Sequence, residues 1–315
     1  MFLRQKKITL LYVLLLVCGC HKVPEQLEPK INYAVQDRYL KQLPAPFPTL
    51  SSEELQEAWG KEYLIGIAFA HQLDLYQSIT AFKRAEILAP EEAHARKLEM
   101  NYEMLLCYYL GKKYTDVIYL FDTSLLRTVD PHFPAYHDLL VILYEAYTEI
   151  QEERKAEQIL FLIQQHYPET AEKLSLSTAL SQANMVQVEA YTNQYPDVQQ
   201  FFAQYQTEKK SVGSAQALNA LLPGAGYLYV GQKQSALTAF LLNGLFIAAA
   251  YHFFHKGDIA AGAIVTSFEA GWYFGGIYGA GEEAKFYNER LYEKYASPLM
   301  NQNKLFPVLM LQYAF

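Results

Sequence analysis

A run of twenty residues without a charge, Ser235 to Phe254, constrains the fold of this chain more than any other feature. As a helix, the run matches the hydrocarbon thickness of a bilayer. A second stretch of similar length, Ile259 to Ala280, carries Glu269 as its only ionisable side chain. Because the linker between them is short and polar, we predict a membrane-embedded helical hairpin within residues 211–298. Two alanine-rich helices buried in a soluble domain would give the same pattern, and that alternative stays open.

Two polar side chains lie inside these apolar stretches. An acid within an apolar helix is costly unless it is paired or faces water, and such residues are often functional. We expect Glu269 to pack or to hydrogen-bond with Asn243 or Tyr251 of the preceding helix, and a proton relay is the alternative. Several glycines give both helices small faces for close packing.

A glycine-rich motif, LLPGAGYLYVGQ, precedes the two stretches. Glycines beside a proline permit a sharp turn, and tyrosines are typical of a membrane interface. A phosphate-binding loop is not expected, because no strand precedes the motif and no Gly-Lys-Ser/Thr follows it. The motif resembles the start of small two-helix membrane modules, including TM2-like domains. The residues that carry this resemblance are Pro223, Gly224, Gly226, Tyr229 and Gly231.

Residues 51–210 have a helical pattern with no convincing strand. Ser51-Ser52-Glu53-Glu54 offers a polar cap with acids at the positive end of a helix dipole. Small residues, aromatics and prolines then recur at offsets similar to those of the tetratricopeptide repeat. They are Gly66, Phe69, Phe82, Ala85 and Pro90 in the first unit, Gly111 and Phe121 in the second, and Tyr147, Ala156 and Pro168 in the third.

The resemblance to tetratricopeptide repeats implies an all-α superhelix whose concave groove holds a protein or peptide partner. A fourth helical pair, about 170 to 207, would cap the stack. The candidate groove residues lie on the first helix of each pair, although the tyrosines among them are as readily explained as core. They are His71, Tyr102, Tyr109, Tyr144 and Glu145.

Residues 1–20 predict export. Three basic residues precede an apolar run, Ile8 to Val17, that is too short to span a bilayer as a mature helix. The ending, Val17-Cys18-Gly19-Cys20, resembles a bacterial lipoprotein signal, which implies cleavage before Cys20 and its acylation. An uncleaved anchor and a plain signal peptide remain alternatives.

Residues 21–50 are rich in proline, which blocks helix, so we predict an extended tether. The lipoprotein resemblance implies a location in the bacterial cell envelope, with the repeat domain in the periplasm and lipid as a partner. Whether the membrane is the inner or the outer one stays open. At the other end, apolar residues recur at every second position from Leu305 to Phe315, which predicts a short strand or an extended tail, residues 299–315, lying on the hairpin module.

The sequence points away from catalysis and from nucleic acid. The net charge is -7, whereas a nucleic-acid-binding chain needs a basic face. His132 and His137 match no standard ligand spacing, so we expect no metal and no cofactor. Cys107 fits a small core residue. We therefore expect a non-enzymatic envelope lipoprotein that acts as an interaction scaffold. A transport or channel component acting through the hairpin and Glu269, and an envelope enzyme accessory, are the alternatives.

Overall fold

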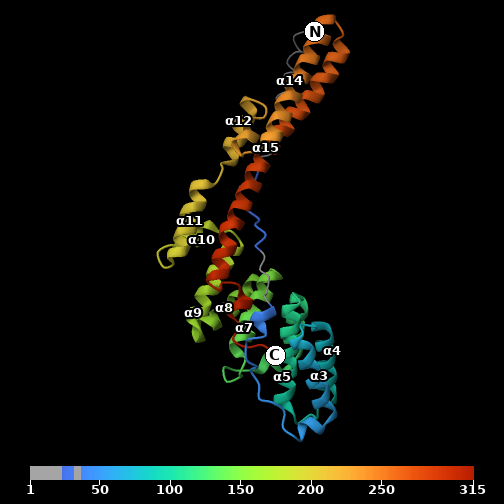
Figure 1. Cartoon of the computed structure of the whole chain (residues 1–315), viewed down its shortest axis with the longest axis vertical. Coiled ribbons are helices and arrows are strands. Elements are labelled where there is room, and N and C mark those ends of the chain that lie inside the picture. Colours follow the sequence, from blue (N-terminus) through green and yellow to red (C-terminus); the bar gives the residue numbers. More distant parts are fainter. Residues whose placement is uncertain (1–22, 32–36) are drawn as a thin grey trace. The chain divides into compact units, whose positions relative to one another are not determined.

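The structure is a computed structural model that describes residues 23–31 and 37–315. Every regular element in these ranges is a helix (Figure 1), which confirms the expected all-α class. The predicted signal segment and Cys20 lie outside the described residues. The described chain forms two compact units. Residues 23–31 and 182–296 make up the α14–α15 unit, and residues 37–181 and 297–315 make up the α3–α9 unit.

The α3–α9 unit is a succession of antiparallel helices in which each helix packs on the next. A short helix, α2 (Asp37–Leu40), and a 3-10 turn, η1 (Glu54–Gln56), come first. The helices that follow are α3 (Ala58–His71), α4 (Leu75–Leu88), α5 (His94–Leu110), α6 (Tyr114–Thr123), η2 (Leu125–Thr128), α7 (Tyr136–Glu149), α8 (Glu153–His166) and α9 (Pro168–Ser181), with η3 (Pro307–Met310) near the end of the chain.

The same tight turn recurs at the end of alternate helices. Leu73, Lys112, Gln151 and Ala183 follow α3, α5, α7 and α9, and all four have a left-handed backbone with φ between 50° and 63°. Such a conformation is uncommon for residues other than glycine. Its recurrence at equivalent places shows that the helices come in structurally related pairs.

A reciprocal cap begins the helical region where the sequence predicts it. The N–H of Ser51 donates to Oε2 of Glu54 at 2.7 Å, and the N–H of Glu54 donates to Oγ of Ser51 at 3.2 Å. This is the capping-box arrangement. It closes the 3-10 turn η1, and α3 begins after it at Ala58. Arg96 of α5 then fixes the cap, because its guanidinium pairs with Glu54 at 2.8 Å.

The core of this unit centres on α5 and α7. Every residue of α7 from Tyr136 to Tyr147 is buried, as is most of the second half of α5. A helix that is covered on all sides occupies the interior of its domain. Cys107 lies in this core, fully buried.

The residues that resemble the repeat signature have mixed environments. Gly66, Phe82, Ala85, Tyr147 and Ala156 are buried in helix contacts. Phe69 and Phe121 are half-buried, and Gly111 is exposed. Pro90 follows α4, as expected of a helix terminator. Pro168 likewise stands two residues after the end of a helix, because α8 ends at His166, and it also begins the next helix, α9, whose first turn does not need the missing N–H.

The contact between α3 and α4 depends on the absence of a side chain at Gly66. A Cβ added there would lie 2.6 Å from ring carbons Cδ1 and Cε1 of the fully buried Phe82. We expect Gly66→Ala to destabilise the unit by roughly 1–3 kcal/mol through overpacking. The control is Gly213→Ala on α12, where a Cβ meets nothing closer than 4.0 Å and helix propensity favours alanine. Thermal unfolding of both variants checks this, and equal melting temperatures would contradict it.

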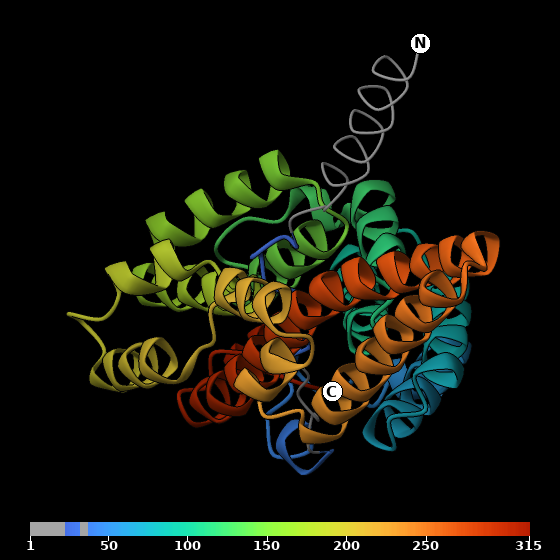
Figure 2. The same cartoon turned by 90° about the horizontal axis from the view of Figure 1, so that it is seen from above.

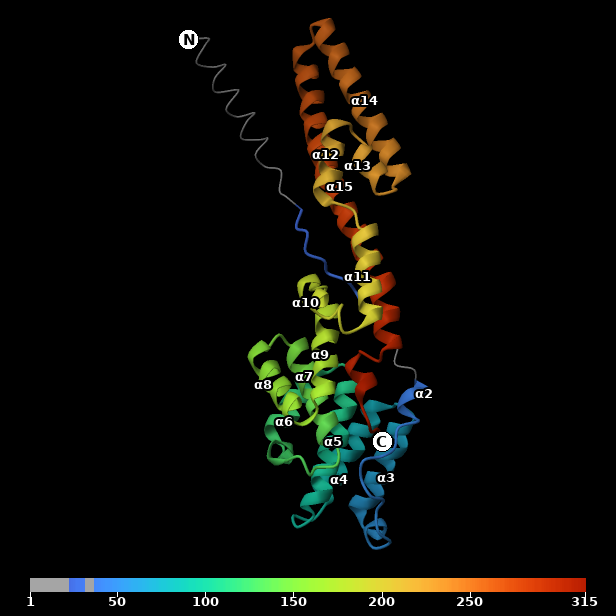
Figure 3. The same ribbon diagram turned by 90° about the vertical axis from the view of Figure 1, so that its left-hand side faces the viewer.

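The α14–α15 unit contains a long pair of antiparallel helices. Its elements are α10 (Met185–Ala190), α11 (Pro196–Glu208), α12 (Val212–Leu221), α13 (Ala225–Tyr229), α14 (Lys233–Lys256) and α15 (Ile259–Gln302). Gly257, with φ 85°, closes α14 in the left-handed conformation and turns the chain into α15. The two helices run side by side in Figure 1 and Figure 3. In Figure 2 they spread apart from the turn that joins them.

The border between the two units differs from the one expected at residue 210. The α14–α15 unit begins at Gln182 and so includes α10 and α11. Aromatic packing explains this difference. The rings of Phe201 and Tyr205 on α11 meet Tyr292 of α15 edge-on, with centroids 5.2 and 5.5 Å apart. These helices therefore do not cap the α3–α9 unit, as expected, but brace α15.

Residues 23–31 of the segment expected to be an extended tether pack within the α14–α15 unit. Val23 is fully buried in a cluster with Val212, Ala215, Val230 and Ala284. The N–H of Glu28 donates to Glu289 at 3.1 Å, and that of Lys30 donates to Glu293 at 2.6 Å. Carboxylates of α15 therefore satisfy backbone donors that an extended chain leaves unpaired.

The end of the chain also differs from the expectation. α15 continues to Gln302, past the expected border at residue 298, and no strand forms in the described residues. Of the two forms predicted for this segment, a short strand or an extended tail, the strand is absent: η3 is followed by chain outside any helix, extended at Leu311. The segment belongs to the α3–α9 unit and not, as expected, to the hairpin module. Of its alternating apolar side chains, Leu305, Leu311 and Phe315 are buried and the others are half-buried.

Candidate functional site

The α3–α9 unit binds the last residues of the chain along α7 and α9. The segment 305–315, which we name the tail, has an extended backbone after η3. Most of its apolar side chains are nearly covered, although Gln312 between them is exposed. The covered residues are Leu305, Phe306, Val308, Leu311, Ala314 and Phe315.

Asp138 of α7 holds the backbone of the tail. The N–H of Gln312 lies 2.9 Å from its Oδ2, and the N–H of Tyr313 lies 2.8 Å from the same oxygen. Asp138 is fully buried, and Nδ1 of His137 lies 2.7 Å from its Oδ1. The other nitrogen of His137 lies 3.0 Å from Oγ1 of Thr170 on α9. A carboxylate that accepts several N–H bonds is a strong and well-oriented anchor.

The segment 37–50 covers the tail from the other side. The hydroxyl of Tyr39 donates to the carbonyl of Leu309 at 2.8 Å, and the N–H of Ala314 donates to the carbonyl of Pro44 at 3.0 Å. Phe47 meets the ring of Tyr102 on α5 edge-on at 5.6 Å. The tail is thus enclosed between the helices and the beginning of the same unit.

Four of the five residues expected to line a groove lie inside the helical core instead. Tyr102, Tyr109, Tyr144 and Glu145 are buried, and only His71 is exposed. The hydroxyl of Tyr109 donates to Oε2 of Glu145, which joins α5 to α7 inside the unit. These side chains pack between neighbouring helices. They hold the helices together and do not face a ligand.

The two histidines that the sequence offers as metal ligands, His132 and His137, have different surroundings. His132 is exposed and lies beside Asp130, while His137 is engaged by Asp138 and Thr170. In the part of the chain that the structure describes, no three His, Cys, Asp or Glu residues come together as a metal site.

Burial of Glu145 predicts a pH dependence. Desolvation raises the pKa of Glu145 to about 7, partly offset by its hydrogen bond from Tyr109. A raised pKa in the folded state means that the folded protein binds the proton more tightly. Stability is therefore greatest below the unfolded pKa near 4.5 and falls as the pH rises towards 7. We expect Glu145 to contribute a loss of roughly 3 kcal/mol over this window, which Glu145→Gln removes and the exposed Glu153→Gln retains. Urea unfolding at pH 4.5 and 7.5 checks this, and a wild-type slope preserved in Glu145→Gln contradicts it.

The glycine-rich motif forms a compact turn between α12 and α14. Gly224 has φ 93°, and its N–H donates to Oδ1 of Asn219 at 2.8 Å. A Cβ on Gly226 would collide with the carbonyl oxygen of Ala215 and with Ala280 of α15. Tyr229 packs under Nζ of Lys210, 5.1 Å from its ring centre. The motif therefore brings α12, α13 and α15 into close contact.

Alanine variants of two glycines in this motif distinguish the cost of a steric collision from the cost of backbone strain. Gly224 and Gly231 both have positive φ, at 93° and 88°, but only a Cβ on Gly224 meets backbone, the carbonyl of Ala236. We expect Gly231→Ala to cost about 1–2 kcal/mol, the cost of a left-handed alanine. Gly224→Ala should cost at least about 2 kcal/mol more, because the backbone itself must move. Thermal unfolding in detergent of the two variants side by side measures the difference, and equal losses would contradict it.

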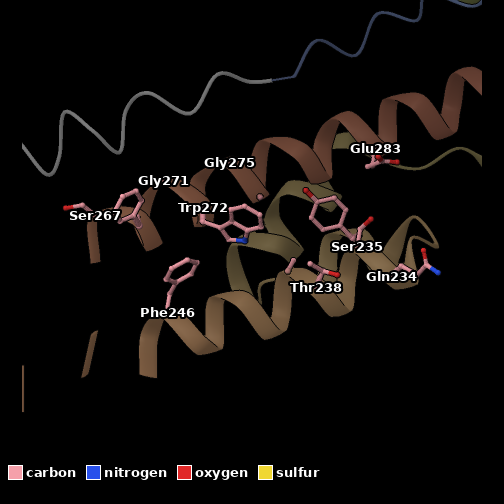
Figure 4. A pocket seen from close by; sticks show the side chains of 13 residues that line it. Gln234, Ser235, Thr238, Phe246, Ser267, Gly271, Trp272, Gly275 and Glu283 are labelled. Atoms are coloured by element: carbon pink, nitrogen blue, oxygen red, sulfur yellow. The ribbon is translucent and has the colours of Figure 1, made fainter. Parts of the chain in front are cut away.

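A pocket of about 880 Å³ lies between α13, α14 and α15. Phe246 of α14 and Trp272 of α15 face each other across it (Figure 4), and Tyr227 of α13 is also part of its lining. Gly271 and Gly275 form part of its α15 wall. The lining is mainly apolar, which suits an acyl chain or an apolar side chain and not a charged ligand.

Glu269 and Asn243 do not pair. Oε2 of Glu269 and Oδ1 of Asn243 are both buried, and neither has a hydrogen-bond partner in the described part of the chain. The amide nitrogen of Asn243 donates to the carbonyl of Ala239 at 2.6 Å. Tyr251, the other expected partner, is 71% exposed and stacks on His255. The expected hydrogen bond of Glu269 to Asn243 or Tyr251 is therefore absent from the described part of the chain, while its expected packing role stays a prediction.

One helix of the described residues, α14, is long and apolar enough to cross a membrane. Only 11% of its most apolar window is buried, so its large side chains are uncovered on most sides. The stretch 259–280 does not meet the same criterion, because Glu269 and the glycines lower its hydropathy. The exposed large apolar residues of the pair are Leu237, Phe240, Leu241, Leu245, Ile247, Tyr251, Phe254, Ile259, Ile264, Phe268, Trp272, Tyr278 and Phe286.

Comparison of the chain with protein-family models, with curated proteins and with solved structures gave no match.

Proposed function

We propose that this protein is a non-enzymatic scaffold of the bacterial cell envelope. In this proposal α14 and α15 form a membrane-embedded hairpin, Cys20 carries a lipid, and the α3–α9 unit binds a protein partner in the periplasm. The observation that carries the proposal is the uncovered apolar surface of α14, of which 11% is buried. An apolar surface of this extent is stable only against lipid or another protein.

Recurring helix pairs support the proposal that the α3–α9 unit binds a protein partner. The left-handed turns at Leu73, Lys112 and Gln151 follow the first helix of three successive pairs. Together with the buried Gly66 and Phe82 at their contact, they favour a stack of tetratricopeptide-like repeats. Such stacks present extended surfaces to peptide and protein partners.

Large apolar side chains on the second helices of the pairs are further candidates for contact. Tyr76 of α4, Tyr119 of α6 and Phe161 of α8 are 79%, 70% and 63% exposed. A photoreactive residue at Tyr119 or Phe161 in the full chain should give one reproducible cross-linked protein in membranes. The matched control is the same residue at the exposed, polar Glu153. Equal, diffuse labelling at all three positions would argue against a scaffold.

A second candidate function is transport or conduction through the hairpin. The buried and unpartnered Oε2 of Glu269 favours this function, since a carboxylate oxygen inside an apolar segment is stabilised by binding a proton or a cation. Glu269→Gln should abolish this activity while the α3–α9 unit stays folded. A fully functional Glu269→Gln protein would exclude this candidate and leave the scaffold.

A further inference from the structure

The α3–α9 unit holds the tail in the way a binding domain holds a peptide. Residues 311–315 belong to no helix. Their backbone instead bonds to the unit around them: Gln312 and Tyr313 donate to Asp138, and Ala314 donates to the carbonyl of Pro44. Bonds to the main chain of an extended segment give affinity without regard to its sequence.

Three side chains of residues 311–315 supply the apolar part of this contact. Leu311, Ala314 and Phe315 are 3%, 2% and 6% exposed, whereas Gln312 points to solvent. A site that binds the backbone through a buried carboxylate and encloses flanking apolar side chains is selective for an extended apolar peptide. Asp138 is already oriented by His137 and Thr170, so the site is preorganised.

The connection that leads to the tail is weak. Pro298 lies inside α15, two residues beyond the border of the units. Proline has no N–H, so it cannot donate the helical hydrogen bond to the carbonyl of Lys294. At the end of α15, Lys304 has a left-handed backbone with φ 51°. The tail can therefore leave its site without unfolding the helices that bind it.

We propose that the surface of α7 and α9 around Asp138 is a peptide-binding site, with the tail as its resident occupant and an extended apolar segment of a partner protein as its ligand. The inference rests on the proposed scaffold function for the existence of that partner. The ligand must offer two consecutive N–H groups to Asp138, which excludes proline at those positions. A carboxylate beside Asp138 would be repelled, so the segment is neutral or basic there.

The test uses the full chain in detergent with a protease site inserted after Asn303, so that the protein folds with its tail and is cut afterwards. The probe is a fluorescent synthetic peptide of residues 305–315 with lysines added at its start for solubility. We expect the cut protein to exchange its tail for the probe and to bind it at least tenfold more tightly than the uncut protein does. A probe that is N-methylated at the positions of Gln312 and Tyr313 should bind at least tenfold more weakly.

Two results would overturn the proposal. One is a cut protein that keeps its helix content but never takes up the probe. The other is loss of helix content when the tail leaves, because the tail would then be part of the core. A second variant, uncut Leu311→Asp, weakens docking of the tail and should also gain probe binding. These measurements need no cellular partner, so a failed cross-linking experiment would refute the scaffold function without deciding this site.

Discussion

Asp138→Ala should destabilise the α3–α9 unit by about 3–5 kcal/mol, the usual cost of removing one member of a buried charged network. The substitution leaves the N–H groups of Gln312 and Tyr313 without their acceptor and removes the partner of His137. Each buried donor that stays unpaired adds about 1–3 kcal/mol. We expect hydrogen exchange at Gln312 and Tyr313 to accelerate before the helices open.

The matched control for this variant is Asp130→Ala. Asp130 also pairs with a histidine, but its side chain is 68% exposed, so its removal should change stability by no more than about 0.5 kcal/mol. Thermal unfolding, with hydrogen exchange followed by mass spectrometry, measures both variants. Equal, small effects at Asp130 and Asp138 would show that the tail is not held by Asp138.

Charges on the exposed face of α14 should release the protein from membranes. Leu241 and Leu245 are 58% and 63% exposed near the middle of the helix. Arginine at the centre of a spanning helix costs about 2.5–3.5 kcal/mol per residue. We therefore expect Leu241→Arg with Leu245→Arg to move the chain to the soluble or aggregated fraction. The experiment is done with Cys20→Ser, so that a lipid cannot hold the protein.

A pair of arginines on the other unit provides the control. Tyr76 and Ile87 of α4 are 79% and 74% exposed. Tyr76→Arg with Ile87→Arg adds the same charge to a helix that we do not place in the membrane. This variant should stay with membranes, and α14 variants that fractionate identically to it would contradict a spanning role for α14.

Local patterns predicted much of the fold because they depend on neighbours in sequence. The reciprocal cap of Ser51 and Glu54, the turn at Gly257 and the apolar run of α14 all involve residues close together in the chain. Pro168 was predicted only to follow the end of a helix, and it does so after α8; that it also begins α9 was not predicted, because proline suits either side of a junction.

The candidate site could not be predicted, because it joins residues far apart in the chain. The sequence shows Asp138 only as the neighbour of His137. Nothing in it indicates that Asp138 binds the N–H groups of Gln312 and Tyr313. Alternation between Leu305 and Phe315 predicted a strand or an extended tail. Burial does not follow the alternation, because Phe306, Val308 and Ala314 are covered too, and only the non-helical chain after η3 agrees with the prediction. The prediction that Tyr102, Tyr109 and Tyr144 line a groove was wrong for a related reason. Periodicity places these side chains on a helix face but does not show what covers that face.

Alkaline carbonate extraction of membranes carrying the full-length Cys20→Ser protein tests membrane attachment through α14. The variant lacks the proposed site of acylation, so retention must come from the polypeptide, and adding Leu241→Arg with Leu245→Arg separates retention by α14 from retention by residues 1–20. We predict that the Cys20→Ser protein stays in the membrane pellet and is released only by detergent. Its quantitative release into the carbonate supernatant would contradict the claim.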